Sequence, residues 1–167
     1  MKIKIFACNL RKRSDRKTSL INEFGSKKSL QMQIVNSISN KYGALGLWLT
    51  IQKIIREKIN QEDDFFIFCE DDHQFTKSYT LEYLQDSIAT AKELKADILC
   101  GGVSWFKIGI QIRENLFWVD KFSGLQFTVI FRSMYEKILS VDNFGLNNAA
   151  DYKISELAES ILVMHPF

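Results

Sequence analysis

The chain has 167 residues, of which 46% are hydrophobic, which is enough to bury the core of one domain and argues against intrinsic disorder. Its 22 Lys and Arg residues nearly balance its 20 Asp and Glu residues, and the basic cluster at 11–17 is too short to serve as a nucleic-acid-binding tail. The longest apolar stretches are short and interrupted by charges, so we expect no transmembrane segment. We therefore expect a single domain, residues 1–167, with no nucleic acid among its partners.

The first strand and helix of the chain are clear in the sequence. Residues 2–8 form an apolar run typical of a strand, and the segment that follows its polar loop has the spacing of an amphipathic helix. Ser14 is a suitable N-cap residue for this helix, and Gly25 is a suitable stop signal. The buried stripe of the helix is expected to comprise Leu20, Ile21 and Phe24.

The middle of the chain continues this alternation of strands and helices. Strands are predicted at 30–35, 65–69 and 97–100, and the apolar run at 65–69 is typical of a strand buried on both faces of a sheet. Apolar residues at helical spacing predict helices over 44–59 and near 80–95. The order of elements is therefore strand, helix, strand, helix, strand, helix, strand.

The pattern loosens after Gly101 into strand-like and loop segments. Residues 125–131 alternate as in a strand with one buried face, and Ser133 with Glu136 forms a capping box for the next helix. A short last helix from about Ala149 and a closing strand at 161–164 complete the chain.

These elements predict an α/β sandwich with a mostly parallel mixed sheet, whose ligands bind beyond the carboxyl ends of the strands. Three polar or glycine-rich segments follow predicted strands, namely 9–16, 70–73 and 101–102. We expect one cleft to hold all three.

Three cysteines, Cys8, Cys69 and Cys100, each fall in an apolar strand-like run, where a reduced thiol behaves as a small buried hydrophobe. Their spacing matches no zinc-binding pattern. Their odd number, with no recognisable secretory signal, favours the cytoplasm. Contact with the inner face of the membrane and the oligomeric state are left open.

An acidic triplet, Glu70-Asp71-Asp72, ends the buried strand at 65–69. Neighbouring carboxylates repel one another unless a cation or hydrogen bonds compensate them, and their oxygens suit Mg²⁺ or Mn²⁺. In extended geometry Glu70 and Asp72 project to one side and share one ligand, while Asp71 projects to the other. The alternative is an ordinary acidic turn between a strand and a loop.

The loop 9–16 places basic side chains directly after a strand and before a helix N-terminus, where backbone N–H groups also favour anions. A nucleotide diphosphate fits such a site. The alternative is a solvated turn in which Arg13 and Arg16 pair with Asp15 or nearby carboxylates. Lys12 is the basic residue most easily assigned to the surface.

These blocks together resemble the family 25 glycosyltransferases, the lipopolysaccharide and collagen galactosyltransferase relatives. The resemblance rests on a strand followed by Asn-Leu-x-x-Arg-x-Asp-Arg at 9–16, a glycine-containing turn at 42–46 before a long helix, and an apolar strand ending in Glu-Asp-Asp. It extends over nearly the whole chain, because Asp151 and a late strand ending in His165 also follow in the expected order.

The resemblance implies a GT-A fold, which is Rossmann-like, and a metal site in which Asp72 is the leading ligand, Glu70 supports the metal or the donor ribose, and His165 is a further ligand. The metal would be Mn²⁺ or Mg²⁺. His165 has the alternative of a surface histidine near the chain end. The nucleotide-sugar site implied by the resemblance comprises Asn9, Arg13, Arg16, Gly43, Glu70 and Asp71.

Asp151 is the candidate general base, which would deprotonate the acceptor hydroxyl in an inverting transfer. It has an alternative, because an acid at the start of a helix also favours the N-terminal dipole without any catalytic role. Four aromatic residues have the chemistry to stack on an acceptor sugar, with core packing as the alternative. They are Trp105, Phe106, Phe117 and Trp118.

Two departures from the family weaken the match. Relatives commonly carry a Ser-His pair in the helix after the glycine turn, where this chain has Leu49-Thr50-Ile51. The chain also ends after Phe167, earlier than most relatives, so we expect either a missing acceptor-binding tail or a truncation.

The sequence therefore predicts a metal-dependent glycosyltransferase that moves a hexose, such as galactose, from a UDP-sugar. The acceptor would be a glycan or lipid-linked molecule in surface polysaccharide biosynthesis. Two alternatives stay open: a non-catalytic binding or assembly module with the same fold, and another Mg²⁺-dependent α/β enzyme acting on a phosphate ester. Against the latter, we find neither a Gly-rich phosphate loop nor an Asp-nucleophile motif.

Overall fold

A computed structural model describes residues 3–60, 62–145 and 148–167. The helices are α1 (Ser14–Phe24), α2 (Gly43–Lys58), α3 (Leu81–Glu93), α4 (Ser133–Leu139) and α5 (Ala150–Leu157). The strands are β1 (Ile3–Asn9), β2 (Leu30–Asn36), β3 (Phe65–Glu70), β4 (Ile98–Cys100), β5 (Trp105–Phe106), β6 (Gly109–Arg113), β7 (Leu116–Val119), β8 (Phe122–Ser123), β9 (Phe127–Phe131) and β10 (Ile161–Met164). Of the predicted first strand, Lys2 lies outside the described residues.

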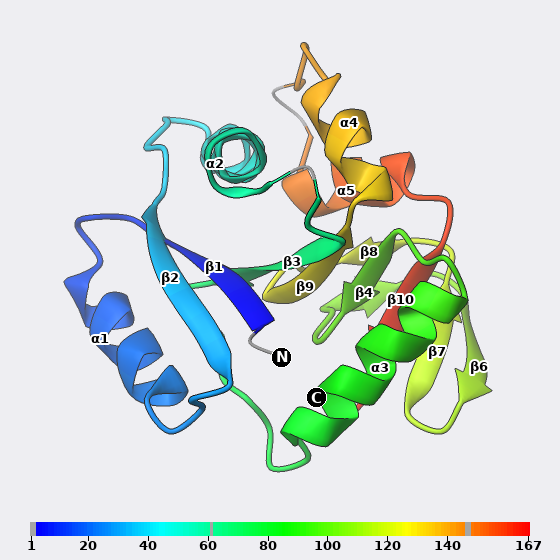
Figure 1. The fold of residues 1–167 in the computed structure, drawn as a ribbon. Helices are drawn as coiled ribbons and strands as arrows, with labels where there is room; N and C mark the ends of the chain where they lie inside the picture. The colour runs from blue at the N-terminus through cyan, green and yellow to red at the C-terminus, as the bar shows by residue number, and fades with distance from the viewer. Residues whose placement is uncertain (1–2, 61, 146–147) are drawn as a thin grey trace.

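Eight strands form one mixed sheet in the order β2-β1-β3-β9-β4-β10-β7-β6, and β5 pairs with β8 in a separate two-stranded sheet. In the large sheet, β9 and β7 run opposite to the other strands. Helices cover both faces, with α2, α4 and α5 on one side and α1 and α3 on the other (Figure 1). The predicted α/β sandwich with a mostly parallel mixed sheet is confirmed.

Most predicted elements form where the sequence places them, but β9 differs in its burial. All five of its residues are buried, although the alternation at 125–131 predicts one solvent-facing side. The strand lies between β3 and β4 in the middle of the sheet, so helices cover both of its faces. Thr128 is therefore fully buried in a strand that otherwise consists of apolar residues.

Two predicted helix caps are wrong. Arg13 is the N-cap residue of α1, and Ser14 is the first helical residue, whose carbonyl accepts a hydrogen bond from Thr18 Oγ1. The capping box at the start of α4 does not form either, because Ser133 Oγ donates instead to the buried Asp97 carboxylate at the beginning of β4. At α4, therefore, a tertiary partner takes the hydroxyl that the cap would need. The predicted burial of Ile21 is also wrong, since it lies beside the buried stripe of α1 with 48% of its surface exposed.

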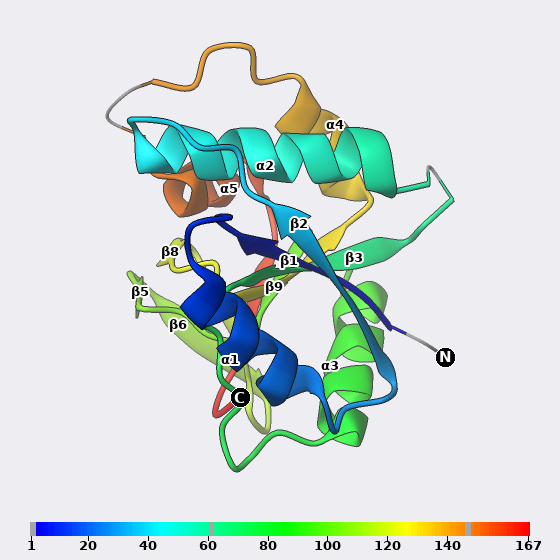
Figure 2. The same cartoon turned by 90° about the vertical axis from the view of Figure 1, so that its left-hand side faces the viewer.

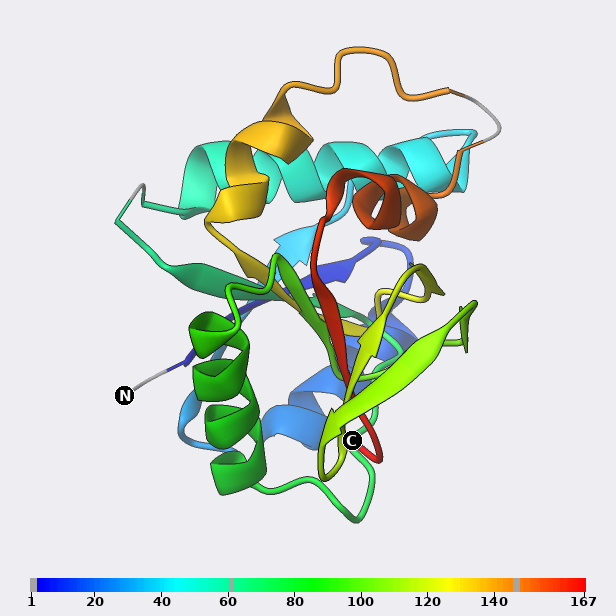
Figure 3. The ribbon, with the colours of Figure 1, turned by 90° about the vertical axis from the view of Figure 1, so that its right-hand side faces the viewer.

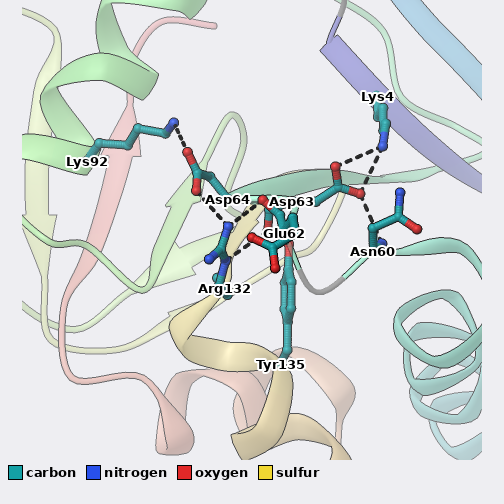
Figure 4. A network of polar contacts seen from close by, with 8 residues as sticks. All are labelled: Lys4, Asn60, Glu62, Asp63, Asp64, Lys92, Arg132 and Tyr135. Atoms are coloured by element: carbon teal, nitrogen blue, oxygen red, sulfur yellow. Dashed lines mark hydrogen bonds and ion pairs between the residues drawn. The ribbon is translucent and has the colours of Figure 1, made fainter.

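A polar network fixes the segment that leads into the amino end of β3 (Figure 4). Asp63 accepts two hydrogen bonds from Lys4 Nζ of β1. Asp64 accepts hydrogen bonds from Lys92 of α3 and from Arg132 before α4, at 2.8 Å each. Arg132 also donates to the backbone carbonyl oxygens of Glu62 and Asp63. Both helix layers are thereby tied to the loop that leads into β3.

Within the described ranges, no helix combines the length and the apolar character needed to cross a bilayer.

Candidate functional site

A pocket of about 230 Å³ lies at the carboxyl ends of three neighbouring parallel strands, β2, β1 and β3. Its lining residues come from the loops that follow these strands and from the beginnings of α1 and α2. The beginnings of these two helices lie on the same side of the molecule (Figure 2). The lining residues are Cys8, Leu10, Lys12, Arg13, Arg16, Ser37, Ile38, Ser39, Asn40, Gly43, Leu47, Glu70 and Asp71. Of the predicted nucleotide-sugar residues, all except Asn9 line this pocket.

Asp71 is the centre of a hydrogen-bonded group that joins β1, α1 and β3. Its Oδ2 accepts a hydrogen bond from Asn9 Nδ2 at 2.7 Å, and its Oδ1 accepts one from Arg16 Nη1 at 2.8 Å. The same guanidinium nitrogen lies 3.0 Å from Asp72 Oδ2. Asn9 is buried, and its amide also donates to the carbonyl oxygen of Arg13. Asn9 therefore holds the loop in place and does not itself line the pocket, and its part in nucleotide-sugar binding stays a prediction.

The predicted alternation of the acidic triplet does not hold. Only Glu70 belongs to β3, whereas Asp71 and Asp72 lie in the turn that follows and both contact Arg16. Once the chain leaves the extended conformation, the two-residue period of a strand no longer fixes the side-chain directions. The expected separation of Asp71 from Asp72 is therefore wrong.

The two arginines of the first loop are both paired with carboxylates. Arg13 Nη2 lies 2.8 Å from Asp15 Oδ2, and Arg16 bridges Asp71 and Asp72. This is the pairing expected of the solvated-turn alternative, but both arginines also line the pocket and are partly exposed. Lys12, assigned to the surface from the sequence, is exposed and lines the pocket as well.

Glu70 is the carboxylate whose proton affinity the fold changes most in this region. Burial raises its pKa, and the nearby negative charges of Asp72, Asp151 and Asp71 raise it further, to about 7, against the opposing effect of Arg16. The positive charge of Arg16 therefore compensates only part of the negative charge around Glu70. Strongly shifted carboxyl groups in pockets are typical of functional sites, where a cation or a substrate completes the balance.

The thiol of Cys8 also lines the pocket. Burial raises its pKa to about 12, and the negative charge of Glu70 adds to this effect. The thiol is therefore neutral and behaves as an apolar wall rather than as a nucleophile.

The beginning of α2 contributes the positive end of a helix dipole to the pocket. Its N-cap residue, Tyr42, provides no side-chain cap, so the first backbone N–H groups of the helix have no partner within the helix. Gly43 lines the pocket, and an added Cβ atom there would meet no atom within 4 Å. At Gly46 the same atom would lie 2.5 Å from the carbonyl oxygen of Ile38.

The two glycines therefore have different roles, and replacing each of them by Ala distinguishes these roles. Gly46→Ala is expected to lower the free energy of unfolding by about 1–2 kcal/mol, because overpacking against the Ile38 carbonyl outweighs the gain in helix propensity. Gly43→Ala is expected to leave stability unchanged or raise it by up to about 1 kcal/mol. Urea denaturation of both variants measures this, and equal effects would contradict the assignment.

Asp151 lies outside the pocket lining but within electrostatic range of Glu70, as the raised pKa of Glu70 shows. It is in the first turn of α5, where Oδ1 accepts a hydrogen bond from the Tyr152 N–H. Its Oδ2 accepts a hydrogen bond at 2.8 Å from the N–H of Gly124, a residue with a φ of +107° in the loop between β8 and β9. The hydrogen bond from Tyr152 agrees with the helix-start alternative, whereas the one from Gly124 ties the carboxylate to the loop before β9. The role of Asp151 as a general base stays a prediction.

The structure does not gather the other predicted segments at the pocket. Gly101 packs against Phe127 and Phe167, because β9 lies between β3 and β4 and moves the end of β4 away from the pocket. The prediction of one cleft for all three segments is therefore wrong. His165 is exposed, and its N–H donates to the carbonyl oxygen of Asn115.

The predicted ligands Glu70, Asp72 and His165 do not form a ready-made metal site. Among the described residues, no three His, Cys, Asp or Glu side chains are arranged to hold a metal ion. Glu70 and Asp72 still interact, because the Asp72 charge is the leading electrostatic contribution to the raised pKa of Glu70. Two carboxylates of this kind fit Mg²⁺, which usually keeps several waters and takes its remaining ligands from substrate phosphates.

Sequence reasoning missed the segment after β2. Ser37, Ile38, Ser39 and Asn40 line the pocket, and the N–H of Ser37 donates to the carbonyl oxygen of Asn9. A signal was present, because these residues directly follow a predicted strand at the same edge of the sheet.

Neither the protein-family models nor the curated proteins compared with this chain give a match. The fold is similar to that of a solved structure of apo UDP-glucose pyrophosphorylase, with a TM-score of 0.51 and 12% sequence identity. The similarity covers 98% of this chain and 72% of that chain. At this identity the similarity concerns the fold alone, and it agrees with the α/β architecture described above.

Proposed function

We propose that this chain is a glycosyltransferase that binds a nucleotide-sugar, with a UDP-sugar as the donor, in the pocket at the ends of β1, β2 and β3. The observation that carries the proposal is the composition of this pocket. Partly exposed Arg13 and Arg16 and the uncapped beginning of α2 favour a diphosphate, directly beside Glu70 and the turn that contains Asp72. The pocket volume is below the range typical of whole drug-sized ligands, so it would hold part of the donor.

The sequence resemblance to family 25 glycosyltransferases and the fold shared with a UDP-glucose enzyme support the same class of ligand. Galactose as the transferred hexose and a glycan or lipid-linked acceptor in surface polysaccharide biosynthesis remain proposals from the resemblance.

We also propose that the site uses Mn²⁺ or Mg²⁺, held by Asp72 and Glu70. The remaining negative charge around Glu70 supports this, because a diphosphate adds further negative charge that Arg13 and Arg16, already paired, only partly offset. A divalent cation would stabilise the charge of the departing diphosphate. Arg16 would then exchange one of its carboxylate contacts for a phosphate oxygen.

Asp151 is the proposed general base. Its carboxylate would accept the proton of the acceptor hydroxyl as that oxygen attacks the anomeric carbon. The hydrogen bonds from Gly124 and Tyr152 would hold the carboxylate in place without neutralising its charge.

Thermal unfolding in the presence of nucleotides tests this proposal. UDP with Mn²⁺ is expected to stabilise the protein by about 3 kcal/mol at one hundred times its dissociation constant, or roughly 5–10 °C in Tm. GDP, CMP, or UDP with EDTA is expected to shift Tm much less. Asp72→Ala is expected to abolish the metal-dependent part, and no response to any nucleotide would refute the proposal.

Asp86→Ala is the matched control, because Asp86 is an exposed carboxylate on α3 outside the pocket. This variant is expected to respond to UDP and Mn²⁺ like the wild type. Equal losses in both variants would show a general charge effect instead of a site.

A non-catalytic binding module is the second candidate function. It is favoured because both carboxylate oxygens of Asp71 already accept hydrogen bonds from side chains, and both oxygens of Asp151 accept hydrogen bonds from the backbone. UDP-sugar hydrolysis separates the two candidates, because a binder responds to UDP in thermal unfolding without releasing sugar.

A further inference from the structure

The segment 105–112 exposes an unusual concentration of large apolar side chains. The exposed fractions are 49% for Trp105, 46% for Phe106, 51% for Ile108, 54% for Ile110 and 37% for Ile112. Exposed apolar side chains concentrated in one short segment are typical of surfaces that bind proteins or membranes, whereas single exposed apolar residues are ordinary. The patch spans β5, the short connection that contains Ile108, and β6, the edge strand of the large sheet.

Two lysines border the aromatic end of this patch. The backbone N–H of Lys107 donates to the carbonyl oxygen of Lys121, which brings the two residues side by side, and neither forms an ion pair within the described part of the chain. The neighbouring Asp120 directs Oδ1 to the N–H of Ile108 at 2.8 Å. Lysines beside exposed Trp, Phe and Ile side chains are the combination that suits an anionic lipid surface.

Apart from Asp120, the other charges of β6 and of the turn that follows it lie away from Trp105 and Phe106. Arg113 donates to Thr90 Oγ1 at 2.8 Å and pairs with Glu93 on α3, so its charge is directed back toward the protein. Glu114 lies in the turn after β6 and has no ion pair among the described residues. Beside Trp105 and Phe106, Lys107 and Lys121 therefore outweigh the one negative charge of Asp120.

A second copy of the chain is a poorer fit for this edge. Pairing of two β6 strands requires regular spacing of free N–H and C=O groups, and the pairing of β6 with β7 shifts register between Gln111 and Arg113. A bulge of this kind interrupts an edge and opposes strand addition. A fluid surface has no such requirement for register.

The strands that carry the patch run on the same side of the molecule as the helix whose beginning lines the pocket (Figure 2). Figures 2 and 3 show β5 and the beginning of β6 on the same side as the beginning of α2. Ser104, directly before β5, lies close to Gly124, because a Cβ atom on Gly124 would be 2.9 Å from the N atom of Ser104. The N–H of Gly124 in turn donates to the Asp151 carboxylate. The segment that leads into β5 therefore lies next to the loop that binds Asp151.

We propose that residues 105–112, with Lys107 and Lys121, form a docking surface for an anionic lipid bilayer. The apolar side chains enter the region of the acyl chains and head groups, and the lysines contact anionic head groups. This role does not depend on which sugar is transferred, or on whether transfer occurs.

Flotation with lipid vesicles tests the proposal. The wild type is expected to bind vesicles of phosphatidylcholine and phosphatidylglycerol mixed at about three to one, and to bind phosphatidylcholine alone at least about tenfold more weakly. Binding should shift the emission of Trp105 to shorter wavelength, and Trp105→Phe should remove the shift, because Trp48 is buried and Trp118 is half-buried.

Two double variants separate the contribution of the apolar side chains from that of the lysines. Ile108→Ser with Ile110→Ser is expected to weaken binding about tenfold, and Lys107→Gln with Lys121→Gln to weaken it similarly on anionic vesicles only. The matched control is Ile21→Ser with Leu94→Ser, which removes two exposed apolar residues elsewhere and should bind like the wild type.

Failure of the wild type to float, or equal losses in the control, would overturn the proposal. A wild-type dimer in sedimentation equilibrium that the Ile108 and Ile110 substitutions dissociate would also overturn it, because a second copy would then cover the patch. None of these outcomes depends on UDP binding, so they are distinct from failure of the proposed transferase function.

Discussion

Replacement of Asp151 by Asn is expected to slow sugar transfer or UDP-sugar hydrolysis by about 10²–10⁴-fold, the usual contribution of a general base. The amide oxygen of Asn still accepts the Gly124 N–H, so the fold and the loop between β8 and β9 should be retained. The dissociation constant for UDP should change by less than about twofold, because Asp151 does not line the pocket. Turnover and UDP binding, measured on the same preparations, separate a chemical role from a structural one.

Glu156→Gln is the matched control for this experiment. Glu156 lies on the same helix, is 55% exposed and pairs with Lys153, so the substitution makes the same chemical change at a surface position. It should leave turnover unchanged. Normal turnover in Asp151→Asn would assign Asp151 only to holding the loop at Gly124 and would favour the helix-start alternative.

The elements of the fold could be predicted because each has a strong local pattern. The long apolar stripe of α2 and the continuous apolar run of β3 determine the type of these elements without reference to the rest of the chain. Strand order could not be predicted in this way. Nothing local in residues 127–131 shows that β9 runs between β3 and β4 in the opposite direction, and this insertion is what removes Gly101 from the pocket.

The site shows the same division between local and tertiary information. The rule that ligands bind at the carboxyl ends of parallel strands correctly brings Arg13, Arg16 and Glu70 together. The sequence does not show that Asn9 is buried beneath the loop, or that Arg16 bridges Asp71 and Asp72, because these depend on side-chain directions after the strands end. The metal ligands and the base remain predictions for the experiments above.

His73 follows the acidic turn directly and provides a second large effect, on stability rather than on activity. It is only 5% exposed, with its ring 4.5 Å from that of Phe75 and 4.8 Å from that of Phe127. Its Nε2 atom has no hydrogen-bond partner among the described residues. Burial lowers its pKa to about 4, and the positive charge of Lys27 adds to this against the opposing charge of Glu23.

The folded state favours the neutral form of His73, so the free energy of unfolding falls as the pH is lowered. The ring is neutral in both states above the ordinary pKa of about 6.5, so the folded state has its full stability there. As pH falls from 6.5 toward 4, the unfolded chain takes up a proton that the folded chain does not. The folded state should therefore lose about 2.5 kcal/mol by pH 4.5 and about 3 kcal/mol in total.

Urea denaturation at pH 7.5 and 4.5, with EDTA present, measures this loss. Glu70, whose pKa is raised to about 7, also changes its charge between these two pH values, so the informative quantity is the difference between the wild type and variants that lack the buried imidazole. His73→Phe keeps an aromatic ring in the cluster, and His73→Leu controls for a steric effect of the larger ring. Between pH 7.5 and 4.5, the free energy of unfolding of each variant should fall by about 2.5 kcal/mol less than that of the wild type. The same pH dependence in all three proteins would show that the imidazole is protonated in the folded state, and that the aromatic cluster admits a charge that burial should exclude.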